Sequence, residues 1–451
     1  MPDACPVYRP RKPHLTPHHQ CVQDHFDTFE RVYEERFAKR YGFWRPYLKE
    51  VIYRYLECGD LHGGFARLVC QTCGRNFLLA YSCKRRYFCP SCHQKRVVEF
   101  GEWLCQHVLK AVPYRHFVFS IPKILRRFFL HDRKLLAALS RCAWESLKAF
   151  LHAAVPAPRA TLGAIVATQT FGQWPDRYHP HLHVLATDGA FYGQGLFRVA
   201  PRFNLKDLEK LFRHSVLSML LRKGKITRQF VRMMEGWRHS GFNVFCGERI
   251  YPHQKQSLER LAAYLIRASF AQERMEYLPE QAAVIYHSKD GKEQKTYDAL
   301  EWIAAMGTHV PLRGEQMVRY YGEFSNRVRG TRRKAHQIAD IPTILEPEIS
   351  SAAARKNWAR LIQKVYEVSP LVCSRCQGPL KVVSFIEDGQ TIRKILEHLG
   401  LWLANARPQP RAHSPPGLRP LPEESHEDSY SQLPAREEED YSQATPAHWD
   451  S

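Results

Sequence analysis

The sequence lacks the features of a membrane-spanning or secreted protein. It contains no run of eighteen apolar residues, and its beginning, MPDACPVYRPRKPHL, has no apolar signal core. A membrane-spanning helix and a secretory signal are therefore not expected. We also find no internal repeat in the 451 residues. Acidic residues are few, with 45 Asp and Glu against 66 Lys and Arg.

The resulting net charge of +21 is unevenly distributed along the chain. The segment Leu401–Ser451 carries nine acidic and four basic residues, so residues 1–400 carry a net +26. A body this basic repels itself unless a polyanion neutralises it, which makes nucleic acid the leading partner and an anionic membrane the second. The Pro-, Ser- and Glu-rich end, residues 403–451, is expected to be disordered. The length suits two to four domains with a real core.

Cysteines are concentrated in one stretch of the chain. Six of the 13 Cys lie between Cys58 and Cys92. Without a secretory signal, clustered cysteines indicate metal ligands rather than disulfides. Two CxxC turns, Cys70/Cys73 and Cys89/Cys92, are separated by fifteen residues. This spacing predicts that the two turns share one structural zinc ion, because each turn presents two thiolates to a tetrahedral centre.

The remaining cysteines allow alternatives. Cys58 and Cys83, with or without His62, form a second zinc site or are simply buried thiols. A later turn, Cys373/Cys376, completes a remote site or is a half-knuckle without a partner pair.

Two groups of cations are predicted to contact DNA phosphates. Arg85 and Arg86 lie among aromatic residues inside the cysteine-rich stretch, and Arg329 and Arg332 belong to a basic cluster near residue 330. Cations interleaved with aromatics favour contact with a nucleic-acid backbone. The alternative for both groups is a solvated charged face.

The central part of the chain alternates between strand-like and helix-like runs. Strands are expected at residues 116–121, 163–170, 181–187 and 242–250, and helices at 132–153, 205–221 and 254–270. The order β-α-β-β-α-β predicts an α+β sheet domain. We divide the chain into a helical segment (1–50), a cysteine-rich zinc-binding domain (51–100), a central domain (101–310), a basic region with the last CxxC (311–402) and the tail (403–451).

A pair of histidines marks a candidate metal site in the central domain. His181 and His183 point to the same face of a strand because side chains alternate with period two. Two imidazoles side by side form half of a ligand shell for a divalent metal, although surface or hydrogen-bonded histidines also explain many such pairs. Gln169 on the neighbouring strand is the expected third ligand, and His179 is the rival.

The sequence around Tyr264 predicts a helix with cations on both sides of this residue. Arg260 and Arg267 lie four residues before and three residues after Tyr264, so all three share one flank of a helix. A tyrosine held between guanidinium groups can act as a nucleophile towards a phosphate. An interfacial tyrosine with solvated arginines is the alternative.

Together these motifs resemble a known family. HPHLHV at residues 179–184 has the histidine–hydrophobic–histidine form of the "HUH" single-strand endonucleases. The chain is more closely similar to the rolling-circle transposases of the insertion sequence 91 family. The matching pieces include CGDLHGGFARLVCQTCG, SCKRRYFCPSCHQKR, QTFGQWPDRYHPHLHVLATDGAF, LERLAAYLIRASFAQERM and CSRCQGPLKVVSFIEDGQTIRKILEHLGL, and they cover roughly residues 40–402 in family order.

The resemblance implies a fold and a mechanism. The central domain would be a ferredoxin-like HUH endonuclease with an antiparallel sheet, an N-terminal zinc-binding module and flanking helices. Mg²⁺ or Mn²⁺ held by His181, His183 and Gln169 would polarise the scissile phosphate, and Tyr264 would attack it to form a 5′-phosphotyrosine. The partners would be single-stranded element ends and DNA hairpins, with a homo-oligomer as a possible assembly. A bacterial cytoplasmic location at the nucleoid would follow.

One departure from the founding members concerns the nucleophile. Those members carry two tyrosines four residues apart, whereas Arg260 and Ala268 occupy the positions four before and four after Tyr264. The chain therefore resembles the single-tyrosine branch. The alternatives are a plasmid replication initiator-type nickase and a zinc-dependent DNA-binding protein without catalysis.

Overall fold

The computed structural model describes residues 12–85, 87–154, 160–192, 196–201, 204–334 and 371–402. The chain divides into two compact units, each of which is built from segments distant in sequence. The first, which we call the cysteine unit, comprises residues up to Phe100, Ala268–Arg313 and the described residues 371–402. The second, the histidine unit, comprises Gly101–Arg267 and the described residues 314–334.

This division differs from the domains predicted from sequence. Residues 268–310, which the sequence placed in the central domain 101–310, belong to the cysteine unit. The predicted basic region, 311–402, is split, because residues 314–334 complete the sheet of the histidine unit while residues 371–402 pack in the cysteine unit. The tail from residue 403 lies outside the described residues.

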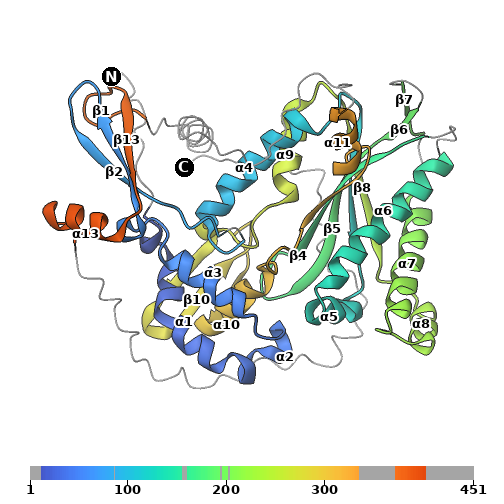
Figure 1. Ribbon diagram of the computed structural model, residues 1–451. Helices are drawn as coiled ribbons and strands as arrows, with labels where there is room; N and C mark the ends of the chain where they lie inside the picture. Colours follow the sequence, from blue (N-terminus) through green and yellow to red (C-terminus); the bar gives the residue numbers. More distant parts are fainter. Residues whose placement is uncertain are drawn as a thin grey trace. The chain divides into compact units, whose positions relative to one another are not determined.

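The histidine unit is built on a five-stranded sheet in the order β12-β4-β5-β3-β8, in which all neighbouring strands are antiparallel. Strands β4, β5 and β8 of this sheet are labelled in Figure 1. The strands are β3 (Tyr114–Ser120), β4 (Gly163–Phe171), β5 (Tyr178–Thr187), β8 (Asn243–Ile250) and β12 (Val318–Gly322). The helices are α5 (Lys123–His131), α6 (Lys134–Ala154), α7 (Leu205–Arg222), α8 (Arg228–Glu235), α9 (Lys255–Leu265) and α11 (Asn326–Lys334), and a small hairpin is formed by β6 (Gly189–Tyr192) and β7 (Leu196–Val199). The prediction of an α+β fold with an antiparallel sheet is confirmed.

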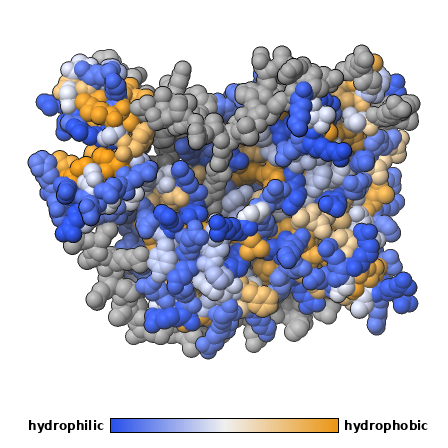
Figure 2. Space-filling view, in the orientation of Figure 1, coloured by the Kyte–Doolittle hydropathy of each residue, from blue (hydrophilic) through white to orange (hydrophobic). Residues whose placement is uncertain are grey.

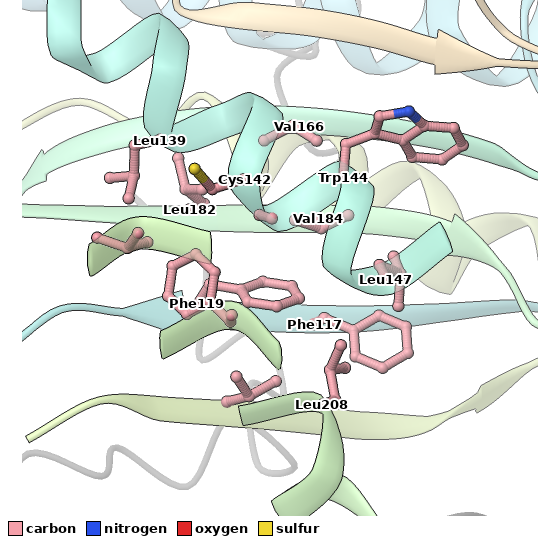
Figure 3. Close-up of a cluster of buried hydrophobic side chains, with 14 of the residues drawn as sticks. Phe117, Phe119, Leu139, Cys142, Trp144, Leu147, Val166, Leu182, Val184 and Leu208 are labelled. Carbon is pink, nitrogen blue, oxygen red and sulfur yellow. The ribbon is translucent and has the colours of Figure 1, made fainter. Parts of the chain in front are cut away.

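The core of the histidine unit lies between one face of this sheet and helices α5 to α8. Figure 3 shows Leu139 and Leu147 of α6 in one buried cluster with Phe117, Leu182 and Val184 of the sheet. These strand residues alternate with His116, His181 and His183, which therefore face the opposite side. The period-two pattern thus separates an apolar face for packing from a polar face that is available for chemistry.

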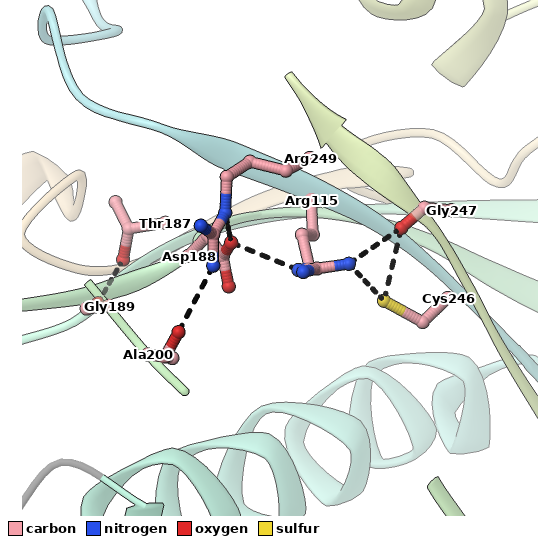
Figure 4. Close-up of polar contacts among 8 residues, drawn as sticks. All are labelled: Arg115, Thr187, Asp188, Gly189, Ala200, Cys246, Gly247 and Arg249. Carbon is pink, nitrogen blue, oxygen red and sulfur yellow. Dashed lines mark hydrogen bonds and ion pairs between the residues drawn. The ribbon is translucent and has the colours of Figure 1, made fainter. Parts of the chain in front are cut away.

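A buried carboxylate holds one end of the sheet together (Figure 4). The side chain of Asp188 is fully buried and pairs with Arg115 of β3, at 3.0 Å, and with Arg249 of β8. Arg249 also donates to the carbonyl oxygen of Ala200 at 3.0 Å. The next residue, Gly189, has φ +151°, and a Cβ there would lie 2.1 Å from the carbonyl oxygen of Arg198. Only glycine allows β6 and β7 to approach this closely.

The cysteine unit contains two small antiparallel sheets, with strand orders β13-β1-β2 and β11-β10-β9. Its strands are β1 (Phe65–Cys70), β2 (Asn76–Ala80), β9 (Met275–Leu278), β10 (Ala283–His287), β11 (Gln294–Asp298) and β13 (Leu380–Ile386). Its helices are α1 (Pro17–Arg36), α2 (Ala38–Tyr41), α3 (Pro46–Leu56), α10 (Ala299–His309) and α13 (Gly389–His398), and α4 (Pro90–His107) continues from this unit into the histidine unit. Trp302 of α10 is fully buried and donates from Nε1 to Nδ1 of His18 in α1, at 3.2 Å.

The surface is largely hydrophilic, with some apolar exceptions. Figure 2 shows hydrophobic residues at the surface of the part that holds β1, β2 and β13, where Val383 is 55% and Phe385 46% exposed. Among the described residues, no helix has both the length and the apolar character needed to cross a membrane.

Candidate active site and metal centres

Four cysteines converge in the cysteine unit at the beginning of α4. Cys58 follows α3, Cys83 lies in the loop after β2, and Cys89 and Cys92 flank the first turn of α4. The Sγ atoms are 3.9 Å apart for Cys58 and Cys92, 3.5 Å for Cys83 and Cys92, and 3.8 Å for Cys58 and Cys89. Four thiolates around tetrahedral zinc, each about 2.3 Å from the ion, are separated by roughly 3.8 Å. The four side chains therefore fit a zinc ion.

Backbone amides support this first centre. The N–H groups of Cys83 and Arg85 point at the Sγ atoms of Cys58 and Cys83, both at 3.4 Å. Contacts among the four thiols lower the pKa of Cys92 and raise the pKa of Cys83 and Cys89. A thiolate is the form that binds the metal, and N–H groups that point at sulfur stabilise it.

A second four-cysteine centre is formed by two turns that are far apart in the sequence. Cys70 and Cys73 lie at the end of β1, and Cys373 and Cys376 lie in the turn before β13. The Sγ atoms of Cys70 and Cys376 are 3.4 Å apart, and those of Cys73 and Cys373 are 3.8 Å apart. The backbone N–H of Cys73 lowers the pKa of the Cys70 thiol to about 6. This set also fits zinc.

The pairing of cysteines predicted from their spacing is therefore wrong. Cys70/Cys73 and Cys89/Cys92 do not share one site, because the antiparallel pairing of β1 with β13 brings Cys373/Cys376 beside Cys70/Cys73. Cys58 and Cys83 join Cys89 and Cys92 in the other centre, which is neither the separate second site nor the simple buried thiols that the sequence suggested. His62 belongs to neither group, and its Nδ1 lies 2.7 Å from Asp60.

Three buried histidines meet on the polar face of the sheet in the histidine unit. The Nε2 atoms of His181 and His183 are 3.1 Å apart. The Nδ1 of His181 lies 2.8 Å from the carbonyl oxygen of His179, and the Nδ1 of His183 lies 3.0 Å from Nε2 of His116 in β3. Burial lowers the pKa of His181 and of His116 to about 4, and the pKa of His183 still further. All three rings are therefore neutral near pH 7.

The proton positions follow from these contacts. A carbonyl oxygen only accepts, so His181 carries its proton on Nδ1 and presents a lone pair at Nε2. If His183 donates from Nδ1 to His116, its own Nε2 presents a second lone pair 3.1 Å from the first. Two nitrogens about 2.1 Å from one ion in neighbouring positions are roughly 3 Å apart. The pair therefore fits a divalent metal, with His116 fixing the ring of His183.

The two strands predicted to be neighbours do pair, and Gln169 of β4 lies opposite His181 of β5. Its side-chain amide donates to the carbonyl oxygens of Tyr264 and Leu265, at 3.1 and 3.2 Å, and its oxygen accepts from Nε of Arg267 at 3.2 Å. Gln169 thus satisfies the last carbonyls of α9, and this helix ends at Leu265 instead of continuing to residue 270 as predicted. A role for Gln169 as a metal ligand stays a prediction.

Tyr264 lies next to the histidines. Its ring centroid is 5.2 Å from that of His183 and 6.4 Å from that of His116. The guanidinium of Arg267 lies 5.0 Å from the same ring. The structure thus brings together Tyr264, Arg267 and both histidines, whereas Arg260 lies exposed on α9.

His116 was not predicted from the sequence as a site residue. The alternation of His116 with Phe117 and Phe119 places it on the polar face of its strand, but nothing in the local pattern indicates that β3 pairs with β5. The register of these two strands, with Val118 opposite His183, is what brings His116 to the site.

The other predicted DNA-contacting arginines have intramolecular contacts. Arg85 pairs with Glu50 at 2.8 Å, and Arg329 lies 5.4 Å from the ring centroid of Trp103. Arg332 pairs with the buried Glu323. Arg86 lies outside the described residues. Contact with DNA therefore stays a prediction for all four.

Comparisons with known proteins agree with this architecture. A family described as "Putative transposase" matches residues 163–332, and a family described as "Transposase zinc-binding domain" matches residues 28–121. "Putative transposase y4qJ" of Sinorhizobium fredii is 27% identical over 71% of this chain and 85% of its own length. "Transposase for insertion sequence element IS801" of Pseudomonas savastanoi pv. phaseolicola is 22% identical over 76% of this chain and 85% of its own length. No solved structure shows a significant match.

The sheet with its histidine pair, the cysteine centres and these relatives define a transposase with an N-terminal zinc-binding domain. In both matched regions and in these relatives, the chain is similar to transposases of the insertion sequence 91 type.

Proposed function

We propose that the histidine unit cuts and rejoins single-stranded DNA at the ends of its element, through a covalent bond to Tyr264. The observation that carries this proposal is the position of the Tyr264 ring, 5.2 Å from His183, beside two Nε2 atoms that are 3.1 Å apart. A nucleophile and a half-shell for a metal thus occupy one place on the polar face of the sheet.

The topology supports this assignment. Strands β3, β4, β5 and β8 are arranged in the order β4-β5-β3-β8 with helices between β3 and β4 and between β5 and β8, which is the strand order of a ferredoxin-like fold. The histidine pair lies on a central strand of that sheet, and the tyrosine lies on the helix after its last strand. This is the arrangement expected of an HUH endonuclease.

His181 and His183, with Gln169 as the third ligand, would hold Mg²⁺ or Mn²⁺, which would draw electron density from the scissile phosphate. The phenolic oxygen of Tyr264 forms a bond to phosphorus and loses its proton, while the bond from phosphorus to the 3′ oxygen breaks and that oxygen gains a proton. Arg267 stabilises the negative charge that develops near the tyrosine. The product is a 5′-phosphotyrosine and a free 3′-OH.

Strand joining is the reverse of this reaction. A 3′-OH attacks the phosphotyrosine and releases Tyr264, so the bond energy is conserved and no nucleotide cofactor is needed. The contacts of the next tyrosine along the chain, Tyr277, agree with Tyr264 as the single nucleophile. Tyr277 belongs to the cysteine unit, where its hydroxyl donates to Asp24 at 2.8 Å and lies 2.9 Å from Nε2 of His25.

We further propose that zinc at both cysteine centres is structural, and that the cysteine unit recognises the element end or a DNA hairpin. The deciding experiment incubates the protein with labelled single-stranded DNA carrying an element end and looks for a covalent adduct on a denaturing gel. Wild type and Tyr277→Phe should form the adduct, and Tyr264→Phe should form none. An adduct with Tyr264→Phe as abundant as with wild type contradicts the proposal.

Two further outcomes separate the alternatives. DNA binding without an adduct in any variant indicates a DNA-binding protein without catalysis. Cleavage at one replication origin with no requirement for matched element ends indicates a replication initiator.

A further inference from the structure

The histidine unit has a pocket on the helix-covered side of its sheet. The pocket lies between α6, α7 and β12 and has a volume of about 730 Å³. Volumes of roughly 300–1,000 Å³ are typical of sites for small organic ligands. His181 and His183 face the other side of the sheet, so this pocket is separate from the candidate active site.

Cations surround the mouth of this pocket. Lys134 and Arg141 come from α6, Lys223 follows α7, and Arg319 comes from β12. Within the part of the chain that the structure describes, none of these four side chains pairs with a carboxylate. The lining also includes Arg222 and one carboxylate, Glu145, so the cavity keeps a net positive charge. An anion bound there would relieve the repulsion among the cations.

The buried part of the lining, which we call the floor, is apolar. Cys142 and Met219 contribute to the lining and are 6% and 5% exposed. Tyr321 also lines the pocket, with its ring stacked on Trp144 at 5.3 Å and its hydroxyl 3.0 Å from that of Ser140. A preformed apolar floor beneath a cationic rim suits a ligand with a flat apolar part and an attached anion.

We propose that this pocket holds one nucleotide of a DNA single strand, with the base on the floor and the backbone phosphates at the rim formed by Lys134, Arg141, Lys223 and Arg319. The choice of DNA as the ligand rests on the proposed function, whereas the preference for a nucleotide rests on the pocket alone. A strand bound here contacts the protein away from the point of cleavage, at the edge of the sheet formed by β12. The pocket would thereby anchor the DNA on which Tyr264 acts.

The first test removes charge from the rim. We compare Lys134→Ala/Arg141→Ala/Lys223→Ala with the control Lys148→Ala/Lys206→Ala/Arg228→Ala, which removes three exposed cations of the same unit that do not line the pocket. Both sets are made in the Tyr264→Phe background, so that binding is measured without cleavage. Fluorescence anisotropy with a labelled thirty-nucleotide single strand gives the affinity at several salt concentrations.

The rim variant should bind roughly tenfold or more weakly than the control. The slope of log affinity against log salt should also fall by about 0.7 for each lost phosphate contact. Equal affinities and equal slopes for the two triple variants overturn the proposal. This result would leave the proposed cleavage reaction untouched, because adduct formation by the protein with Tyr264 intact is measured separately.

The second test fills the floor without changing the charge. Ala138 lines the pocket, and Ala138→Trp should weaken binding to the strand while the salt slope stays the same. Because this variant can also disturb α6, wild type is cross-linked to a strand containing 4-thiothymidine, and the modified peptide is identified by mass spectrometry. A cross-link at Met219 or Tyr321 supports the proposal, and cross-links confined to other regions overturn it. Binding of free thymidine monophosphate as tight as that of the strand shows a free-nucleotide site and overturns the DNA assignment.

Discussion

The rings of His116 and His183 stack with their centroids 5.2 Å apart and with the Nε2 of His116 3.0 Å from the Nδ1 of His183. Residues that bind the second nitrogen of a metal-binding histidine fix its ring and its proton, and their loss typically weakens metal binding by about 10–100-fold. His116 thereby becomes a positioning residue for the proposed metal, although it lies on a different strand from the histidine pair.

His116→Ala is accordingly expected to weaken binding of Mn²⁺ by about 10–100-fold, because His183 loses the partner that holds its proton on Nδ1. Isothermal titration of the protein with Mn²⁺ gives the affinity, and nicking rates at increasing Mn²⁺ give the apparent requirement. High Mn²⁺ should restore nicking. His116→Gln, which keeps a hydrogen-bond acceptor, should recover part of the affinity. An unchanged Mn²⁺ affinity in His116→Ala means that this contact does not position the metal ligand.

The two cysteine centres predict two zinc ions per chain. Cys373→Ser should lower the zinc content measured by atomic emission to about one, because it removes a ligand of the centre with Cys70, Cys73 and Cys376. Cys89→Ser should remove the other ion, and Cys105→Ser, outside both groups, should remove neither. Full zinc content in Cys373→Ser would contradict this centre and favour the pairing of Cys70/Cys73 with Cys89/Cys92.

Because His18 is buried, we expect the protein to lose stability in mild acid. Burial lowers its pKa from 6.5 to about 3, so between these values the unfolded chain takes up a proton that the folded chain does not. This proton uptake does not affect stability well above pH 6.5. As the pH falls below 6.5 it lowers the free energy of unfolding, by about 2 kcal/mol at pH 5. His18→Gln can still accept from Trp302, and it should lose less stability than wild type between pH 7.5 and pH 5. Urea unfolding measures this difference, and the exposed His14→Gln should behave as wild type. Parallel losses in His18→Gln and wild type would show that His18 does not carry this pH dependence.

Asp188 is expected to be essential for stability of the histidine unit. Asp188→Asn leaves Arg115 and Arg249 without their shared carboxylate, which should lower the free energy of unfolding by about 2–4 kcal/mol. These arginines keep some exposure, at 19% and 26%, so the loss should lie below that of a fully buried group. The melting temperature of Asp188→Asn is compared with that of Asp207→Asn, which removes an exposed carboxylate paired with Lys210. Similar melting temperatures for the two variants would show that the buried pair contributes little.

Much of the histidine unit could be predicted from local patterns. The strand from Gly163 to Thr170 is present within β4 (Gly163–Phe171), and the helix expected at 132–153 is α6 (Lys134–Ala154). The end of α9 was misjudged, because the amide of Gln169 satisfies the carbonyls of Tyr264 and Leu265 from a distant strand. A helix end set by a tertiary hydrogen bond leaves no signal in the sequence of the helix itself.

The sequence by itself indicated the residues that we propose carry the chemistry. Period two places His181 and His183 on one face, the helical pattern places Tyr264 on one flank with Arg260 and Arg267, and the CxxC turns supply thiolates for zinc. Only the tertiary structure decided which of these groups meet. Pairing of β3 with β5 brings His116 to His183, and pairing of β1 with β13 brings Cys373/Cys376 to Cys70/Cys73. The reason is physical, because side-chain periodicity depends on neighbouring residues, whereas strand pairing depends on the packing of segments that here lie more than 300 residues apart.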